Sequence, residues 1–160
     1  MKSRKLVHLI LIIAMVFPMM LFAGIQKFAF HGITLNMTAD EVNSIVEGSN
    51  CMKFTRQNKV VCGNFRDHAL LMDFRNERLF SLMAKADVED MQKAFDERLV
   101  QMKKVYGTPA QIDANKYVAL FNEDDRAALL RVKESSSGTG LLFYVICEDI
   151  ECEDIRELMK

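Results

Sequence analysis

The sequence predicts an α+β domain: an antiparallel sheet of hairpins with a short N-terminal helix and one long helix packed on one face. Two observations support this prediction. Residues 87–109 combine an amphipathic period with start and stop signals, the pattern of a single long helix. The segments on either side alternate apolar and polar residues in short runs separated by turn residues, which is typical of antiparallel strands with one covered face.

Residues 1–23 have the composition of a secretory signal peptide. Basic residues precede an apolar run over residues 6–22, and Ala23 suits the position just before a cleavage site. The run lies near the lower length limit for spanning a bilayer, so an uncleaved inner-membrane anchor is the alternative. Either way, residues 24–160 are predicted to be one exported domain, periplasmic or secreted.

Charge argues against one class of partner. Removing residues 1–23 takes away three positive charges and no negative ones, so the formal net charge changes from −1 to −4. A mildly acidic domain without a basic stripe is not typical of nucleic-acid-binding proteins. We therefore expect no nucleic-acid partner, and membrane contact only through a retained leader.

All four cysteines lie in the exported part, where an even number favours disulfide bonds. Four cysteines allow three connectivities, and we favour the one in which both disulfides close short local loops. These pairs are Cys51–Cys62 and Cys147–Cys152. The spacing lacks paired C-x-x-C motifs with nearby histidines, so no metal site is expected.

The exported domain is predicted to begin with a strand over residues 26–35 and a short helix. Thr38 is a good N-cap for that helix, Glu41 completes a capping box, and Gly48 ends it. Two hairpins follow. We expect the first to join residues 52–55 to 59–64, and the second to join residues 69–74 to 79–85.

The long helix is predicted to begin at Asp87 as N-cap and to end at Gly107 and Pro109. Its apolar residues recur at steps of three and four and are assigned to the core. These are Met91, Phe95, Leu99, Met102 and Tyr106. At 1.5 Å per residue, about nineteen residues would extend roughly 28 Å, which is enough to cross a small sheet.

After the helix, residues 116–121 and 127–132 are predicted to form a third hairpin. Residues 141–147 read as a final strand. The acidic tail from Cys147 is predicted to form a last helical turn through Ile150, Ile155 and Leu158.

Two segments resemble a known family: FHGITLNMTADEVNSIVEG (residues 30–48) and VYGTP (residues 105–109). They are similar to β-lactamase-inhibitor-protein-like domains, including the SmpA/OmlA (BamE) group of small envelope proteins. These modules open with a capped "GMT-x-x-E/Q-V" helix followed by antiparallel strands. Asn36 stands where glycine is usual, and the lipid-anchor cysteine of the BamE group is missing. The resemblance implies binding of other proteins on an open sheet face.

No catalytic constellation stands out in the exported part. His31 and His68 lie in no metal or nucleophile motif, and the run Ser135 to Ser137 lacks the lysine and helix of a phosphate-binding loop. We therefore expect a protein that is not an enzyme and has no cofactor.

The leading hypothesis is an exported, non-catalytic protein-binding module of the bacterial cell envelope that uses an open sheet face. Alternation along the strands offers four candidates for that face, namely Leu71, Met83, Val118 and Tyr144. The alternative is a small-molecule-binding or enzymatic cystatin-like domain with a pocket between helix and sheet.

Overall fold

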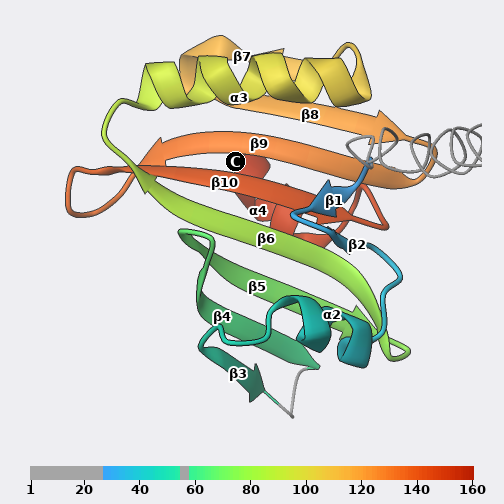
Figure 1. The fold of residues 1–160 in the computed structure, drawn as a ribbon. Helices are drawn as coiled ribbons and strands as arrows, with labels where there is room; N and C mark the ends of the chain where they lie inside the picture. The colour runs from blue at the N-terminus through green and yellow to red at the C-terminus, as the bar shows by residue number, and fades with distance from the viewer. Residues whose placement is uncertain (1–26, 55–57) are drawn as a thin grey trace, which may run out of the picture.

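The computed structural model describes residues 27–54 and 58–160, and its central feature is an antiparallel sheet with helices on both faces (Figure 1). The described residues form eight strands in this sheet, in the order β3-β4-β5-β6-β10-β9-β8-β7. Every neighbouring pair in it is antiparallel. The predicted α+β class is confirmed.

One half of the sheet, the first meander, consists of four strands in sequence order. They are β3 (Cys51–Phe54), β4 (Lys59–Phe65), β5 (His68–Arg75) and β6 (Arg78–Val88). Its tight turns Arg66-Asp67 and Asn76-Glu77 have positive φ at both residues, as two-residue hairpin turns require. The two predicted hairpins are present as the pairs β3–β4 and β5–β6, and the Arg66-Asp67 turn joins them. The turn of the first hairpin, at residues 55–57, lies outside the described residues.

The other half, the second meander, forms after the long helix α3 (Met91–Tyr106) has carried the chain to the far edge. It comprises β7 (Gln111–Asp113), the 3₁₀ turn η2 (Ala114–Lys116), β8 (Val118–Glu123), β9 (Arg126–Glu134) and β10 (Gly140–Cys147). Strand β10 then returns to pair with β6, which joins the two meanders in the middle of the sheet.

The long helix begins later than predicted. Asp90, not Asp87, is its N-cap and accepts a bond from the backbone N–H of Lys93. Asp87 instead pairs with Leu141. The hydrogen-bonded ladder between β6 and β10 continues to Val88, and it keeps residues 87 and 88 in the strand. The predicted end is confirmed: Gly107 has a φ of 82°, which glycine adopts readily.

The N-terminal segment crosses the face of the sheet on which α3 lies. Instead of one strand, it forms β1 (Ala29–Phe30) and β2 (Ile33–Thr34), which pair with each other. The capping box of α2 (Ala39–Ile45) is confirmed, with Thr38 and Glu41 bonding each other's backbone N–H groups. Helix α2 buries Val42 in the same core as Phe95 and Leu99 of α3.

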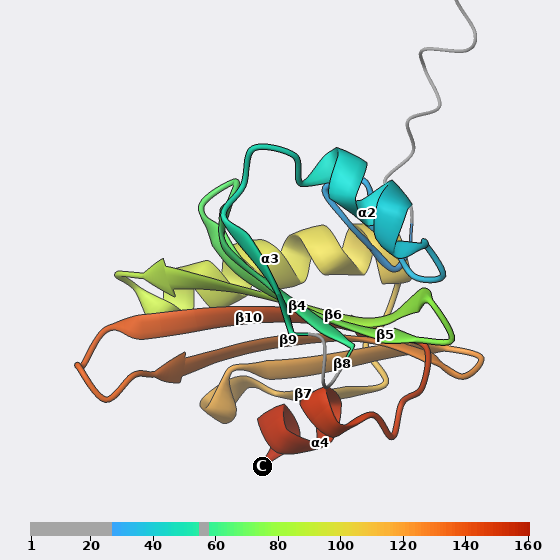
Figure 2. The same cartoon turned by 90° about the horizontal axis from the view of Figure 1, so that it is seen from below.

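The C-terminal helix corrects the expectation that helices cover one face only. Helix α4 (Glu153–Met159) lies on the face opposite α2 and α3 (Figure 2). Its Ile155 and Leu158 are buried in a second core cluster with Leu129 and Val145 of the sheet. The acidic tail thus forms a longer helix than predicted. Its Ile155 and Leu158 pack on the apolar residues of this second face of the sheet, and that packing stabilises the helix.

A bulge in β6 changes the predicted face of one residue. Strict alternation over residues 79–85 would place Phe80 on the same face as Leu82. Asp73 instead pairs with Ser81 and Phe74 with Leu79, so Phe80 is the extra residue. Its ring packs against the second cluster instead.

In the part of the chain that the structure describes, no helix is long and apolar enough to cross a membrane.

Candidate protein-binding face

Helix α4 covers only part of its side of the sheet, and the remainder is a candidate binding face. This open face carries four partly buried apolar side chains, from Val61 on β4, Leu71 on β5, Met83 on β6 and Leu141 on β10. Val61 pairs with Leu71 and Leu71 pairs with Met83, so these three form a row across the strands. They share one face because side chains on directly paired residues point to the same side.

The row continues beneath α4. Met83 pairs with Val145 on β10, and Val145 pairs with Leu129 on β9; both of these are completely buried. Met83 and Leu141 border the second cluster without being enclosed by it. The apolar surface is therefore continuous from the covered half of the sheet to the open half.

At one end of the open face lies a hollow of about 450 Å³ beside the β9–β10 hairpin. Leu141 is its apolar wall, and its neighbours in the strand register, Asp87 and Lys133, line it together with Lys85. The hydroxyls of Ser135, Ser137 and Thr139 also line it and bond one another at 2.7 to 3.1 Å. The hollow thus presents both charges and hydroxyl groups beside an apolar strip.

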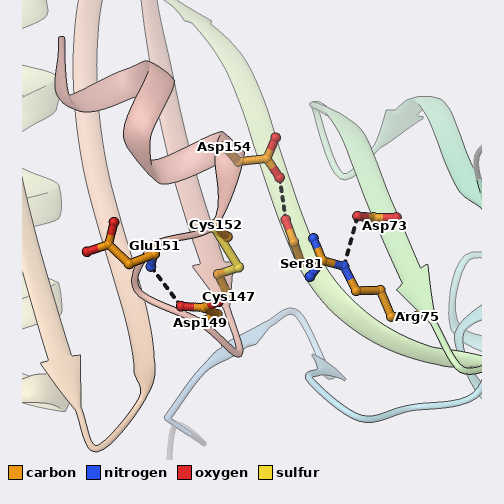
Figure 3. The surroundings of a disulfide bond; sticks show 8 residues. All are labelled: Asp73, Arg75, Ser81, Cys147, Asp149, Glu151, Cys152 and Asp154. Carbon is orange, nitrogen blue, oxygen red and sulfur yellow. Dashed lines mark hydrogen bonds and ion pairs between the residues drawn. A yellow bond between two sulfur atoms is a disulfide. The ribbon is translucent and has the colours of Figure 1, made fainter.

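The other end is defined by the attachment of α4 (Figure 3). The Cys147–Cys152 disulfide ties the end of β10 to the residue that precedes α4. Ser81, which pairs with Cys147 across the strands, donates a hydrogen bond to the Asp154 carboxylate. A covalent bond and a partly buried hydrogen bond therefore fix the helix where the open face begins.

Asp73 lies beside this attachment on β5. Burial raises the pKa of its carboxyl group, and the nearby Asp154 carboxylate adds to this effect, while Arg75 and Lys59 oppose it. The Arg75 Nε atom is 3.8 Å from the Asp73 carboxylate, and the guanidinium carbon is 3.5 Å from the centre of the Phe80 ring. Arg75 therefore forms part of the rim of the open face.

The second disulfide lies at the sheet edge. Cys51 and Cys62 are directly paired between β3 and β4, with 2.08 Å between their sulfur atoms. The predicted pairing of the four cysteines is thus found. Disulfides persist in oxidising compartments, so the pairs indicate that the protein resides outside the cytoplasm.

Arg131 is an unusual member of the covered part of this face. It pairs with Phe143 on β10 and Val118 on β8. Its Nε and Nη1 atoms are buried, and no acceptor among the described residues reaches them. Leaving a charged donor buried without a partner is costly, so we expect this residue to lower the stability of the fold.

The four residues proposed from the sequence separate into three places. Leu71 and Met83 lie next to each other on the open face. Val118 is on the same side of the sheet but is buried in the second cluster, to which α4 contributes. The sequence did not place a helix on that side. Tyr144 faces the opposite side, where its hydroxyl lies 2.7 Å from that of Tyr106 and donates to the Ala29 carbonyl.

Tyr144 therefore belongs to the N-terminal packing. Burial raises the pKa of its phenol well above the ordinary value. Alternation along 141–147 separates its odd from its even residues but does not tell which set is uncovered when both faces are apolar. For the same reason, the sequence did not identify Val61 and Leu141 as residues of the open face, because apolar side chains of these types suit either face.

Comparisons with known proteins add no family to these observations. No family model, curated protein or solved structure matches the chain. The resemblance to β-lactamase-inhibitor-protein-like domains stays a prediction. Among residues 27–54 and 58–160, no group of three or more histidine, cysteine or acidic side chains is arranged to hold a metal ion.

Proposed function

We propose that this protein is an exported, non-catalytic binding module of the bacterial cell envelope, periplasmic or secreted, that holds a protein partner on its open face. The two disulfides support an oxidising compartment. The arrangement of side chains on the sheet supports the choice of face.

The observation that carries the proposal is the apolar row of Val61, Leu71 and Met83, which no described element covers. Leu141 lies farther along the same face, opposite Asp87. A sheet buries such a row when a helix lies over it, as α4 does over Val145 and Leu129. Contiguous apolar surface left in contact with water commonly marks an interaction site. A partner that covers the open face would complete the layer that α4 begins.

The surroundings of this row suit a protein partner. Lys85, Asp87 and Lys133 at the hollow, with Asp73 and Arg75 at the other end, form a charged rim around an apolar centre. Protein interfaces have this organisation, with a dry core and a polar, wet rim. The flexible Met83 side chain can adapt to the shape of the partner.

The alternative, a small-molecule site between helix and sheet, receives less support. The hollow has a volume typical of ligand pockets, but Leu141 is its only apolar lining residue, whereas ligand pockets are lined mostly by apolar side chains. It also lies on the open face, away from the interface between α3 and the sheet where this alternative places a pocket.

Paired charge substitutions test the proposal. Leu71→Asp and Met83→Asp place a carboxylate in the proposed contact and should abolish recovery of a specific partner from envelope extract. Val100→Asp is the matched control, because Val100 is 55% exposed on α3, an element of the opposite face.

All three variants should keep the unfolding temperature within a few degrees of the parent, because none of the three side chains is fully buried. Equal recovery by all folded variants, or equal loss in Val100→Asp, would count against the open face as the binding surface.

A further inference from the structure

Three basic side chains gather on the face opposite the open face, where the N-terminal hairpin meets the sheet, and the charge of a fourth, Arg98, acts on one of them. His31 lies in the β1–β2 turn, Arg66 in the β4–β5 turn, His68 at the start of β5 and Arg98 on α3. They come from separate parts of the chain, so the fold is what brings them together. A cluster of positive charge contrasts with the acidic net charge of the exported domain.

Direct contacts hold three of these side chains together. The Arg66 guanidinium lies 3.2 Å from Nδ1 of His31, and the Arg66 carbonyl lies 2.7 Å from Nδ1 of His68. Both imidazole rings pack edge-on against Phe30, with ring centres 4.6 and 5.0 Å away. The two imidazole centres are 6.2 Å apart, a separation that one small ligand can bridge.

These contacts also fix the hydrogen atoms on the rings. A guanidinium only donates, so Nδ1 of His31 accepts, and neutral His31 carries its proton on Nε2. A carbonyl only accepts, so Nδ1 of His68 carries the proton that bonds the Arg66 carbonyl. The Nε2 atom of the His68 ring is not part of this bond.

Positive charge in the cluster has no neutralising partner among the described residues. No carboxylate in residues 27–54 or 58–160 forms an ion pair with Arg66 or Arg98. Burial lowers the pKa of His31, and the charges of Arg66, His68 and Arg98 lower it further.

We propose that His31, Arg66 and His68, with Arg98 as a neighbouring charge, form a binding site for a phosphate group. Guanidinium and imidazole N–H groups are suited to phosphate oxygens, which accept several charge-assisted hydrogen bonds at once. The phosphate is either free or part of an anionic lipid headgroup. Binding is coupled to proton uptake, so phosphate binds more tightly as the pH falls through the range in which histidine titrates.

Histidine NMR tests the site, because His31 and His68 are the only histidines after residue 23. The titration of His31 is followed in inorganic phosphate and in chloride of equal ionic strength, with His31→Asn and His68→Gln to assign the signals. Asparagine is chosen at position 31 because the backbone there has a φ of 49°, which asparagine tolerates.

Phosphate should raise the pKa of His31 in a saturable way, and Arg66→Gln should weaken phosphate binding by about tenfold through loss of a charge-assisted hydrogen bond. Arg156→Gln is the control, because it removes the same charge from α4 on the opposite face. An identical His31 titration in phosphate and chloride, or equal weakening by both folded variants, would overturn the site.

Vesicles distinguish the two sources of phosphate. Arg66-dependent sedimentation with phosphatidylglycerol vesicles, but not with phosphatidylcholine vesicles, identifies a lipid headgroup. Saturable binding of inorganic phosphate without vesicle binding identifies a free phosphate group, and the absence of both rejects the proposal. None of these results depends on the open face, so the two proposals can fail separately.

Discussion

The two meanders share one sheet and one antiparallel geometry, but described elements cover them differently. In the second meander, Ala127 to Leu130 on β9 are all buried, because α3 lies on one side and α4 on the other. In the first meander, β5 alternates: Leu70, Met72 and Phe74 are buried, whereas Leu71 and Asp73 are partly exposed.

This difference separates two tasks within one domain. The second meander supplies the doubly covered core that stabilises the fold. In the first meander, α4 reaches only β6, through Ser81 and Phe80, and no described element covers the open face of β4 and β5. That face is proposed to be available for binding. Stability and binding should therefore respond to substitution at different positions, and the following predictions test that separation from the largest effect to the smallest.

The largest contrast is expected between two leucines on the same side of the sheet. Leu129→Ala should lower the free energy of unfolding by about 2–5 kcal/mol, because it leaves a cavity in the doubly covered half. Leu71→Ala should cost less than about 1 kcal/mol, because the side chain is already partly in water. Chemical denaturation measures both, and equal losses would contradict the comparison.

The two disulfides offer a second contrast. Their cysteines are 11 residues apart for Cys51–Cys62 and 5 apart for Cys147–Cys152. Constraint of the unfolded chain predicts a loss of about 3 kcal/mol when both cysteines of the first bond become serine, and about 2 kcal/mol for the second.

The second pair also anchors α4, so its loss should additionally expose the apolar cluster beneath the helix. Hydrophobic dye binding should rise for Cys147→Ser with Cys152→Ser. It should stay at the parent level for Cys51→Ser with Cys62→Ser, and an equal rise in both double variants would argue against α4 as a cover.

The smallest effect has the opposite sign. Arg131→Met replaces a partly buried guanidinium, whose two buried nitrogens have no acceptor among the described residues, with an apolar side chain. The free energy of unfolding should rise by about 1 kcal/mol. Arg126→Met is the control, because Arg126 is exposed and its Nε lies 3.2 Å from the Glu148 carboxylate, so its replacement should not raise stability. A lower free energy of unfolding in Arg131→Met would show that the Arg131 donors are satisfied.

Local signals in the sequence were sufficient for much of the fold. The capping box at Thr38, the closing Gly107 and the Asn76-Glu77 turn each depend on neighbouring residues, and each lies where it was predicted. Both disulfides also close short loops. What could not be predicted depends on distant partners: the length of β6 is set by β10, which therefore determines where α3 begins.

The candidate site was predicted only in part for the same reason. Alternation places Leu71 and Met83 on one face, but it does not reveal that α4 buries Val118 or that the N-terminal segment covers Tyr144. The Phe80 bulge shifts the pattern by one residue without a glycine or proline to signal it. Which apolar face remains open is decided by tertiary packing, which no single strand encodes.

The central claim, that the uncovered face of the first meander binds a protein, is tested most directly by site-specific photo-crosslinking. A photoreactive residue is placed at position 71 or 83, and at the exposed position 100 on α3 as the control. The account predicts one discrete adduct of the same mass from positions 71 and 83, and none from position 100. No adduct from the open face, or the same adduct from position 100, would contradict it.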